Sequence, residues 1–284
     1  MMNFMGSGGR RWILLVLASI VTIACCASSR SQSKPAAVPE FRPGLLVGYL
    51  PTKALPNSLA LLPPPPTKGS AAFAFDEEVA RRTFPLRGKP RFTLALSDYD
   101  LRFPHAAGTF SCALNALITE QDTPHLYVLL RRTLTDVGLS TYAAKDHYNR
   151  NRPFMLNNEP ICAPETKPEL EKDGSYPSGH TAVGWAWALI LSEISPQQTD
   201  AILARGRAFG ESRNVCNHHW NSDVVWGRFM GAATVARLHA DTTFRADLEA
   251  AKAELAVVRA KSFKPTRDCN VEASAMALQL PLAP

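Results

Sequence analysis

The sequence predicts an all-α protein whose folded part is a single-domain helical bundle. Five segments carry apolar residues at spacings of three and four, the period of an amphipathic helix, at residues 126–148, 181–194, 199–211, 224–239 and 246–260. Alternating patterns typical of strands are scarce, and turn signals such as Ser195-Pro196 separate the helical segments. With 284 residues, 46% of them hydrophobic, the chain is long enough to bury a large core.

Segment 181–194 is the most apolar of the five. It carries apolar residues on nearly every side, including Trp185 and Trp187. A helix without a polar face is typical of the centre of a protein. We therefore expect the other helices to surround it.

The N-terminus has the pattern of an export signal in residues 1–31. Arg10 and Arg11 precede an apolar run at 12–24, and small and polar residues follow at 27–31. Thirteen residues are too few to span a bilayer comfortably, although a retained signal anchor is the alternative. Cys25 adds a lipoprotein leader, with lipid anchoring at that cysteine, as a second alternative. We expect a periplasmic or secreted protein without an integral membrane span once the leader is removed.

Composition divides the remaining chain into three parts. Prolines concentrate in residues 32–66, which favours a proline-rich extended arm. The helical patterns place the folded domain at 67–264 and leave 265–284 as a C-terminal tail. The net charge of +6 suits anionic ligands, but the 31 basic and 25 acidic residues are spread along the chain, so we expect no nucleic-acid partner.

Four cysteines follow the leader, at Cys112, Cys162, Cys216 and Cys269. An even number of cysteines in an oxidising compartment favours disulfides, and three pairings are open. Because no CxxC motif occurs, we expect no structural zinc site.

The first polar cluster ends the helical segment 126–148. Arg152 lies seven residues, about two helical turns, after Lys145, so both cations can approach one face. Pro153 disfavours helical backbone at Arg152 and frees its guanidinium to turn into a site. Taken alone, a basic helix end is more often a solvated face.

The second cluster opens the most apolar helix and contains Ser178, Gly179 and His180. A helix N-terminus presents unpaired N–H groups, and glycine lets an anion approach them closely. Ser178 could cap the helix or bind the ligand. His180 could donate a proton to a leaving oxygen beside that anion.

The third cluster contains Arg213, His218, His219 and Asp223. If His219 begins the next helix, Asp223 lies four residues on and directly above it. A carboxylate there holds one imidazole nitrogen protonated and leaves the other as a nucleophile. His218 is out of register with Asp223 by one residue, and a surface His–Asp pair is the structural alternative.

Together the clusters supply cations, helix N–H groups, a nucleophile and an acid, which phosphoryl transfer requires. Their order and spacing resemble the signature of the type 2 phosphatidic acid phosphatase and vanadium haloperoxidase superfamily, with KxxxxxxRP at 145–153, PSGH at 177–180 and SRxxxxxHxxxD at 212–223. Flanking residues are similar to the bacterial class A nonspecific acid phosphatases, with LPPPP at 62–66, DGSYPSGHTA at 173–182 and further matches along 210–228. The chain departs from those relatives at Asn217-His218, and Cys112 and Cys269 look additional.

The resemblance implies the superfamily's helical bundle and a metal-independent acid phosphatase that needs no cofactor. It implies that small phosphomonoesters are hydrolysed through a phosphohistidine, with phosphotransfer as a side activity, by a chain that could form a homo-oligomer. His219 would attack phosphorus, Asp223 would orient it, and His180 would protonate the leaving alcohol and then activate water. The residues implied to bind phosphate are Lys145, Arg152, Ser178, Gly179 and Arg213.

Four alternatives stay open at this stage. The first is a vanadate-dependent haloperoxidase, because vanadate imitates the phosphate transition state. The second is a non-catalytic periplasmic phosphate-binding protein, and the third is a metal-dependent hydrolase with His218, His219 and Asp223 as ligands. A membrane lipid phosphatase is disfavoured because no apolar run beyond the leader approaches about 20 residues. Leaving-group recognition is not encoded in these motifs, so the physiological substrate stays unassigned.

Overall fold

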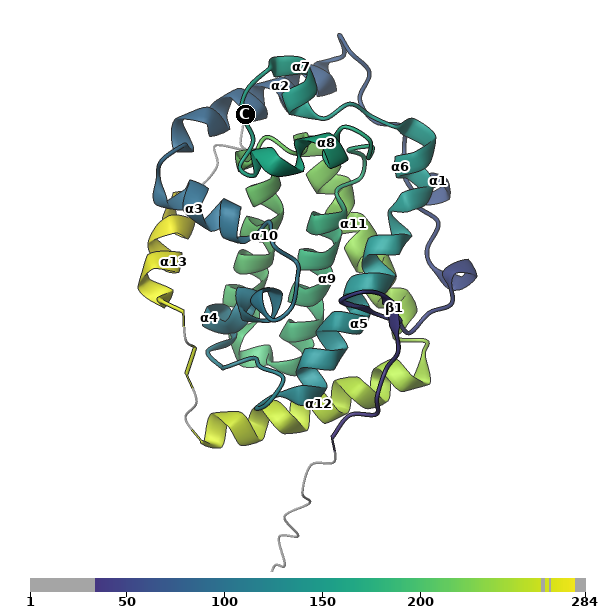
Figure 1. The fold of residues 1–284 in the computed structure, drawn as a ribbon, viewed down its shortest axis with the longest axis vertical. Coiled ribbons are helices and arrows are strands. Elements are labelled where there is room, and N and C mark those ends of the chain that lie inside the picture. The colour runs from purple at the N-terminus through teal and green to yellow at the C-terminus, as the bar shows by residue number, and fades with distance from the viewer. Residues whose placement is uncertain (1–33, 262–263, 266, 279–284) are drawn as a thin grey trace, which may run out of the picture. The chain divides into compact units, whose positions relative to one another are not determined.

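The computed structural model describes residues 34–261, 264–265 and 267–278, and the expected leader and Cys25 lie outside the described residues. The described part consists mainly of helices, with one short two-stranded sheet and connecting loops, which confirms the all-α prediction (Figure 1). None of its helices is both long enough and apolar enough to cross a membrane. The α-helices are α1 (Ser58–Leu61), α2 (Ala71–Thr83), α3 (Pro90–Ser97), α4 (Ser111–Leu114), α5 (Pro124–Ser140), α6 (Tyr142–Tyr148), α7 (Pro153–Asn157), α8 (Lys167–Leu170), α9 (Gly179–Ile194), α10 (Thr199–Val215), α11 (Asn221–Leu238), α12 (Thr242–Ala260) and α13 (Cys269–Ala277).

Short elements complete the described chain. A two-stranded antiparallel sheet pairs β1 (Glu40–Arg42) with β2 (Leu45–Leu46). Gly44 lies between the strands with a positive φ of 81°, a backbone conformation that glycine adopts without strain. The 3-10 helices are η1 (Thr52–Ala54), η2 (Phe84–Leu86), η3 (His105–Phe110), η4 (Pro164–Thr166) and η5 (Pro196–Gln198).

Helix α9 is the central helix that its sequence predicts. It packs against α10, α11, α5 and α12, and α12 crosses the lower end of the bundle in Figure 1. Trp187 is fully buried, and its indole N–H donates to the carbonyl of Leu130 in α5 at 3.2 Å. An apolar helix can lie here because its neighbours cover most of its surface and leave only one side, with Trp185 and Leu189, partly exposed.

The predicted helix at 126–148 is two helices, α5 and α6, which meet at Thr141. The Thr141 hydroxyl donates to the carbonyl of Gly138 at 2.8 Å, and its backbone N–H bonds the same carbonyl. A threonine that bonds back to the preceding turn bends a helix. Apolar spacing did not reveal the break, because both helices keep a face toward the core.

The described part of the expected arm, residues 34–66, packs against the helices instead of lying in solvent. The N–H groups of Tyr49 and Leu50 donate to the carboxylate of Asp136 in α5, at 2.8 and 3.1 Å. Leu46 and Tyr49 are buried there. Further along, the hydroxyl of Tyr176 donates to the carbonyl of Pro63 at 2.8 Å, which connects the LPPPP stretch to the loop before α9.

Two disulfides select one of the three cysteine pairings left open by the sequence. Cys112 bonds Cys269, and Cys162 bonds Cys216. The first attaches α13 to α4, so part of the expected tail at 265–284 is joined to the bundle. The second links the turn after α10 to the segment that precedes α8.

Candidate active site

All eight predicted site residues lie at the end of the bundle where α9 and α11 begin. Elements distant in the chain carry them, with Lys145 on α6, Arg152 before α7, Arg213 on α10 and His219 before α11. These four side chains are almost fully buried. The remaining members are Ser178, Gly179 and His180 at the start of α9 and Asp223 in the first turn of α11.

His219 is held between a guanidinium and a carboxylate. Its Nε2 lies 3.0 Å from Nη1 of Arg152, and its Nδ1 lies 3.4 Å from Oδ2 of Asp223. Because a guanidinium only donates, Nε2 must be the nitrogen with the free lone pair. The ring proton therefore lies on Nδ1, toward Asp223, and Nε2 carries the lone pair.

The helix geometry behind this pair differs from the prediction. Helix α11 begins at Asn221, so His219 lies before the helix and Trp220 is its N-cap. Asp223 accepts the backbone N–H of Trp220 at 2.9 Å, and the same oxygen faces His219. The carboxylate thus caps the helix and orients the imidazole at once.

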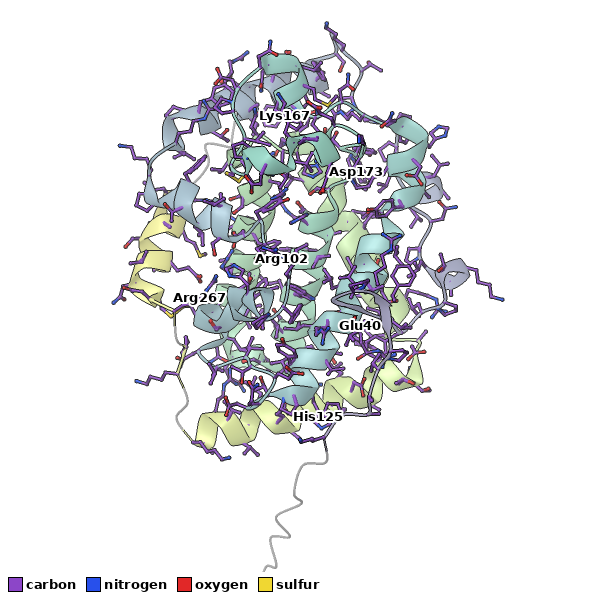
Figure 2. The ribbon with its side chains drawn as sticks, in the orientation of Figure 1. Glu40, Arg102, His125, Lys167, Asp173 and Arg267 are labelled. Atoms are coloured by element: carbon purple, nitrogen blue, oxygen red, sulfur yellow. A yellow bond between two sulfur atoms is a disulfide. The ribbon has the colours of Figure 1, made fainter. Side chains whose placement is uncertain are left out.

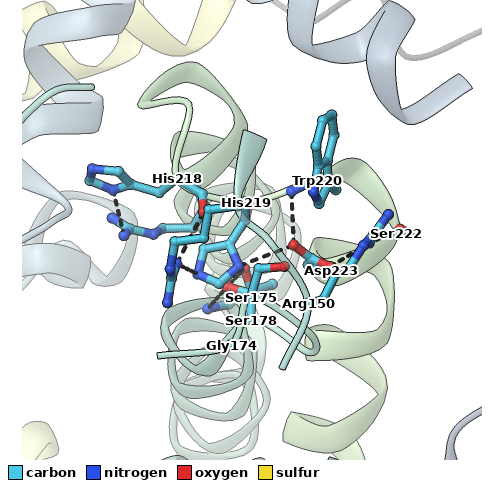
Figure 3. A network of polar contacts seen from close by, with 12 residues as sticks. Arg150, Gly174, Ser175, Ser178, His218, His219, Trp220, Ser222 and Asp223 are labelled. Atoms are coloured by element: carbon cyan, nitrogen blue, oxygen red, sulfur yellow. Dashed lines mark hydrogen bonds and ion pairs between the residues drawn. The ribbon is translucent and has the colours of Figure 1, made fainter. Parts of the chain in front are cut away.

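Arg150 fixes Asp223 from the opposite side, as Figure 3 shows. Its Nη1 donates to Oδ1 of Asp223 at 2.6 Å and to the hydroxyl of Ser222 at 2.8 Å. Its Nη2 pairs with buried Asp76 at 2.8 Å. Burial raises the pKa of Asp223, and Arg150 and the Trp220 N–H oppose that rise.

Burial keeps the His219 imidazole neutral. The pKa of His219 is lowered well below its usual value, first by desolvation and then by the charges of Arg152, Lys145 and Arg213. A neutral imidazole retains the lone pair that attack on phosphorus requires.

Three cations surround the position that His219 Nε2 faces. Lys145 and Arg152 share one partner, the carboxylate of Asp173, at 3.0 and 2.7 Å. Desolvation and the neighbouring Arg152 charge lower the pKa of Lys145 to about 8. Desolvation and the same arginine lower the pKa of Arg213 to about 9. Cations that are costly to bury in this way favour an anionic ligand.

Arg213 is held by His218, a histidine that the sequence did not predict to take part in the site. Its Nη2 donates to Nδ1 of His218 at 2.7 Å, and its guanidinium lies 5.4 Å from the ring centre of Tyr99. Its Nε and Nη1 are buried without a partner among the described residues. Figure 3 shows His218 and His219 turned away from each other, so His218 positions an arginine and takes no part in the His219–Asp223 pair.

The start of α9 forms the floor of the site. The Ser178 oxygen accepts from the N–H of Thr181 at 3.3 Å and from its hydroxyl at 2.9 Å, so Ser178 caps the helix. Its own hydroxyl proton is used by neither bond. The N–H groups of the first turn, at Gly179 and His180, have no acceptor within a helix.

Gly227 lets α11 approach this floor. The N–H of Ser178 donates to the carbonyl of Asp223 at 3.0 Å, which joins the two helices. A Cβ atom at Gly227 would lie 2.6 Å from the carbonyl oxygen of Ser178 and 3.0 Å from the Cβ of Thr181. Only glycine fits, because such contacts are repulsive.

We expect Gly227→Ala to separate α11 from the start of α9 and to displace Asp223 from His219. Overpacking of this kind costs about 1–3 kcal/mol of stability, and a displacement near 1 Å lowers kcat/KM by about 10²-fold. Thermal unfolding and steady-state kinetics measure the two effects. Gly138→Ala in α5 is the matched control, because nothing lies within 4 Å of a Cβ there. Wild-type kcat/KM in Gly227→Ala would contradict the packing argument.

Tyr99 fixes the tautomer of His180. Nε2 of His180 donates to the backbone carbonyl of Tyr99 at 3.0 Å, and the two rings stack with centres 5.8 Å apart. Nδ1 is therefore the nitrogen that can exchange a proton with a ligand. Ser212 supports this loop, because its hydroxyl donates to Asp98, the residue before Tyr99, at 2.7 Å.

Desolvation and the charge of Arg213 lower the pKa of His180 well below its usual value. Protonation of a leaving alcohol by His180, which the resemblance implies, requires a protonated His180 beside a neutral His219. In the free site both imidazoles are neutral at moderate pH. A bound anion offsets the cations, so the proton on His180 has to be gained when the ligand binds.

Four supporting residues escaped the sequence argument, namely Arg150, Asp76, Tyr99 and Asp173. Arg150 stands two residues before Arg152 in the first cluster, and Asp173 opens the DGSYPSGHTA stretch, so position in a motif was their only signal. Asp76 and Tyr99 carry no local pattern. No group of three His, Cys, Asp or Glu side chains suitable for a metal ion occurs within the described ranges.

The chain matches known proteins over most of its length. Residues 125–246, which contain all the predicted site residues, match the PAP2 superfamily. The chain is 40% identical to a non-specific acid phosphatase of Providencia stuartii over 84% of this chain and 98% of that protein. It is also 40% identical to an acid phosphatase of Zymomonas mobilis, over 77% of this chain and 83% of that protein. A non-specific acid phosphatase of Salmonella typhimurium is 41% identical over 70% of this chain and 80% of its own length. The chain thus belongs to the class A nonspecific acid phosphatases of the PAP2 superfamily.

Proposed function

We propose that this protein is an acid phosphatase that hydrolyses small phosphomonoesters through a phosphohistidine on His219. The observation that carries the proposal is the position of His219 Nε2, an unprotonated nitrogen among three buried cations with a carboxylate behind the ring. The names of the relatives support the same reaction class.

In the first half-reaction, Lys145, Arg152 and Arg213 bind the phosphoryl oxygens, with the Ser178 hydroxyl and the Gly179 N–H. Nε2 of His219 forms a bond to phosphorus while the bond to the leaving oxygen breaks. Nδ1 of His180 gives its proton to that oxygen, so the product leaves as a neutral alcohol. The positive charge that develops on His219 lies against Asp223.

In the second half-reaction, His180 acts as a base. Its neutral Nδ1 takes a proton from water, and the water oxygen attacks phosphorus. The P–N bond breaks, its electron pair returns to His219, and inorganic phosphate leaves. An acceptor alcohol in place of water yields a new phosphomonoester, which is the proposed phosphotransferase side reaction.

We propose that the catalytic domain spans residues 67–264, that the protein is exported, and that the reaction requires no metal ion. Two disulfides favour an oxidising compartment, in line with the export signal expected at 1–31. The cations around the site repel a metal ion, and His218 and His219 are already engaged by Arg213 and Asp223.

The pH dependence follows from the two shifted groups in the free enzyme. Because the pKa of His219 is lowered well below 6.5, the nucleophile stays neutral in moderate acid and kcat/KM is retained there. Because the pKa of Lys145 is about 8, a phosphate-binding charge is lost above that pH and kcat/KM falls. A log profile of kcat/KM from pH 4 to 10 checks both limbs. A rate that rises steadily to pH 9 would contradict the assignment.

A substrate panel tests the reaction class. Aryl, sugar and nucleoside monophosphates are assayed for phosphate release with and without EDTA, and bromide oxidation by peroxide is assayed with added vanadate. We expect hydrolysis of several monoesters that EDTA leaves unchanged. Bromide oxidation that exceeds phosphate release would favour the haloperoxidase, and lasting EDTA inhibition that added metal reverses would favour a metal-dependent hydrolase.

A further inference from the structure

Asp173 occupies the cationic side of the site with its own negative charge. One oxygen of its carboxylate lies 3.0 Å from Nζ of Lys145 and 2.7 Å from Nη2 of Arg152. Within the described ranges, it is the carboxylate that ion-pairs with these two cations. Their other contacts are with backbone carbonyls, of Gly174 for the lysine and of Leu170, Asp173 and His218 for the arginine, and with Nε2 of His219, which lies 3.0 Å from Nη1 of Arg152.

A phosphoryl group needs the same donors. The proposed reaction assigns Lys145 Nζ and the Arg152 guanidinium to substrate oxygens, and both Nζ and the guanidinium Nη2 already donate to a single carboxylate oxygen of Asp173. Two anions cannot share them without strong repulsion, since like charges about 4 Å apart interact by several kcal/mol inside a protein. Substrate must therefore displace the carboxylate or bind against its charge.

The carboxylate is placed so that it can move. The Asp173 side chain is 36% exposed, whereas the side chains of Lys145 and Arg152 are only 5% and 2% exposed. Asp173 therefore lies on the solvent side of the buried cations, after α8, where Figure 2 labels it. Rotation of this side chain toward water uncovers the donors without moving a helix.

We propose that the Asp173 carboxylate is a built-in competitor of phosphate, which substrate displaces on entry and which returns as inorganic phosphate leaves. This proposal rests on the proposed function, because it concerns the same cations. The carboxylate neutralises Lys145 and Arg152 between turnovers and weakens the binding of substrate and product together. Such uniform weakening raises KM and the inhibition constant of phosphate without loss of kcat.

The opposite role for Asp173 is as a holder that keeps the two cations in place for phosphate. The two roles predict opposite changes in phosphate affinity when the charge of Asp173 is removed. In Asp173→Asn, a competitor is lost and phosphate binds more tightly, whereas loss of a holder weakens phosphate binding. Direct binding of inorganic phosphate decides between them, because it does not depend on turnover.

Asp173 also raises the pKa of Lys145, so the pH dependence of kcat/KM gives a second test of the proposal. The charged groups facing Lys145 are Arg152, which lowers its pKa, and Asp173 and Asp223, which raise it. Asp173 itself also faces Tyr142, whose pKa it raises after desolvation. Loss of the Asp173 charge lowers the pKa of Lys145 below about 8. The alkaline fall of kcat/KM in Asp173→Asn therefore begins at a lower pH than in the wild type.

The experiment is calorimetric titration of inorganic phosphate into the full chain at pH 6, with steady-state kinetics on the same samples. For Asp173→Asn we expect phosphate affinity to rise about tenfold and KM to fall by a similar factor. A tenfold change corresponds to only part of the repulsion between two like charges at close range. Asp173→Glu keeps the charge and should bind phosphate about as weakly as the wild type. Glu171→Gln is the matched control, because this exposed residue two positions earlier pairs only weakly with Lys167, at 3.9 Å.

Unchanged or weaker phosphate binding in a folded Asp173→Asn variant overturns the proposal. So does equal tightening in Glu171→Gln, since a general loss of negative charge would then be the cause. If Asp173→Asn lowers the melting temperature strongly, Asp173→Ser is titrated in its place with the same expected sign. Failure of this proposal leaves the proposed phosphatase intact, because that function is tested by phosphate release and by His219.

Discussion

His219→Ala is expected to lower kcat for p-nitrophenyl phosphate by roughly 10⁴-fold or more, because removal of a nucleophile leaves only binding and electrostatics. Nε2 of His219 faces Arg152 with a free lone pair and has Asp223 behind its ring, whereas Nδ1 of His218 is engaged by Arg213. Stopped and steady-state assays of purified protein measure the loss. Phosphate binding should persist, because Lys145, Arg152 and Arg213 are unchanged.

Substitutions of two other histidines show whether the loss is specific to His219. His147→Ala on the exposed side of α6 is the control and should retain wild-type rates. His218→Ala should have an intermediate effect, because Arg213 loses the acceptor that holds its Nη2. If His218→Ala were inactive and His219→Ala active, the nucleophile would be assigned to the wrong residue.

His180→Ala is expected to show a loss that depends on the leaving group. General acid catalysis contributes about 10²–10⁴-fold, and the larger figure applies when the departing oxygen is strongly basic. An alkyl phosphate, such as glycerol phosphate, should therefore lose far more activity than p-nitrophenyl phosphate. The reason is structural, since Tyr99 holds Nε2 and leaves Nδ1 of His180 for the ligand.

The measurement is kcat/KM for a series of phosphomonoesters graded by the acidity of the product alcohol. The slope against leaving-group pKa should be shallow in the wild type and steep in His180→Ala. Ser97→Ala, at the end of α3 and two residues before Tyr99, is a control, since its hydroxyl lies 3.3 Å from Nε2 of His105 and outside the site. Equal losses for all leaving groups in His180→Ala would assign this residue to phosphate binding rather than to proton transfer.

The helices of the core were predictable because their patterns are local. Segment 181–194 became α9, since an apolar helix has no stable place except the centre. The break at Thr141 and the packing of residues 45–50 on Asp136 were not predictable. Both depend on hydrogen bonds to groups that the sequence pattern does not single out, and for Asp136 the partners lie far away in the chain.

In the site, too, local spacing was predictable and contacts between distant segments were not. Spacing alone predicted that His219 and Asp223 lie together, and they do. The reason differs from the prediction, because His219 lies before α11 and Asp223 reaches it as the carboxylate that caps this helix. The contacts of Arg150 with Asp223 and of Tyr99 with His180 could not be read from spacing, because they join segments 73 and 81 residues apart. Asp173 was visible in a motif, but its contact with two cations required the fold.

The central claim is that phosphate is transferred to Nε2 of His219. Rapid mixing with a radiolabelled phosphomonoester, a quench in alkali and peptide mapping by mass spectrometry test it most directly, since a phosphorus–nitrogen bond survives base and breaks in acid. We predict label on the peptide that contains His219, lost on acid treatment and absent from His219→Ala. Label on another residue, or turnover in that variant without any covalent label, would contradict the account.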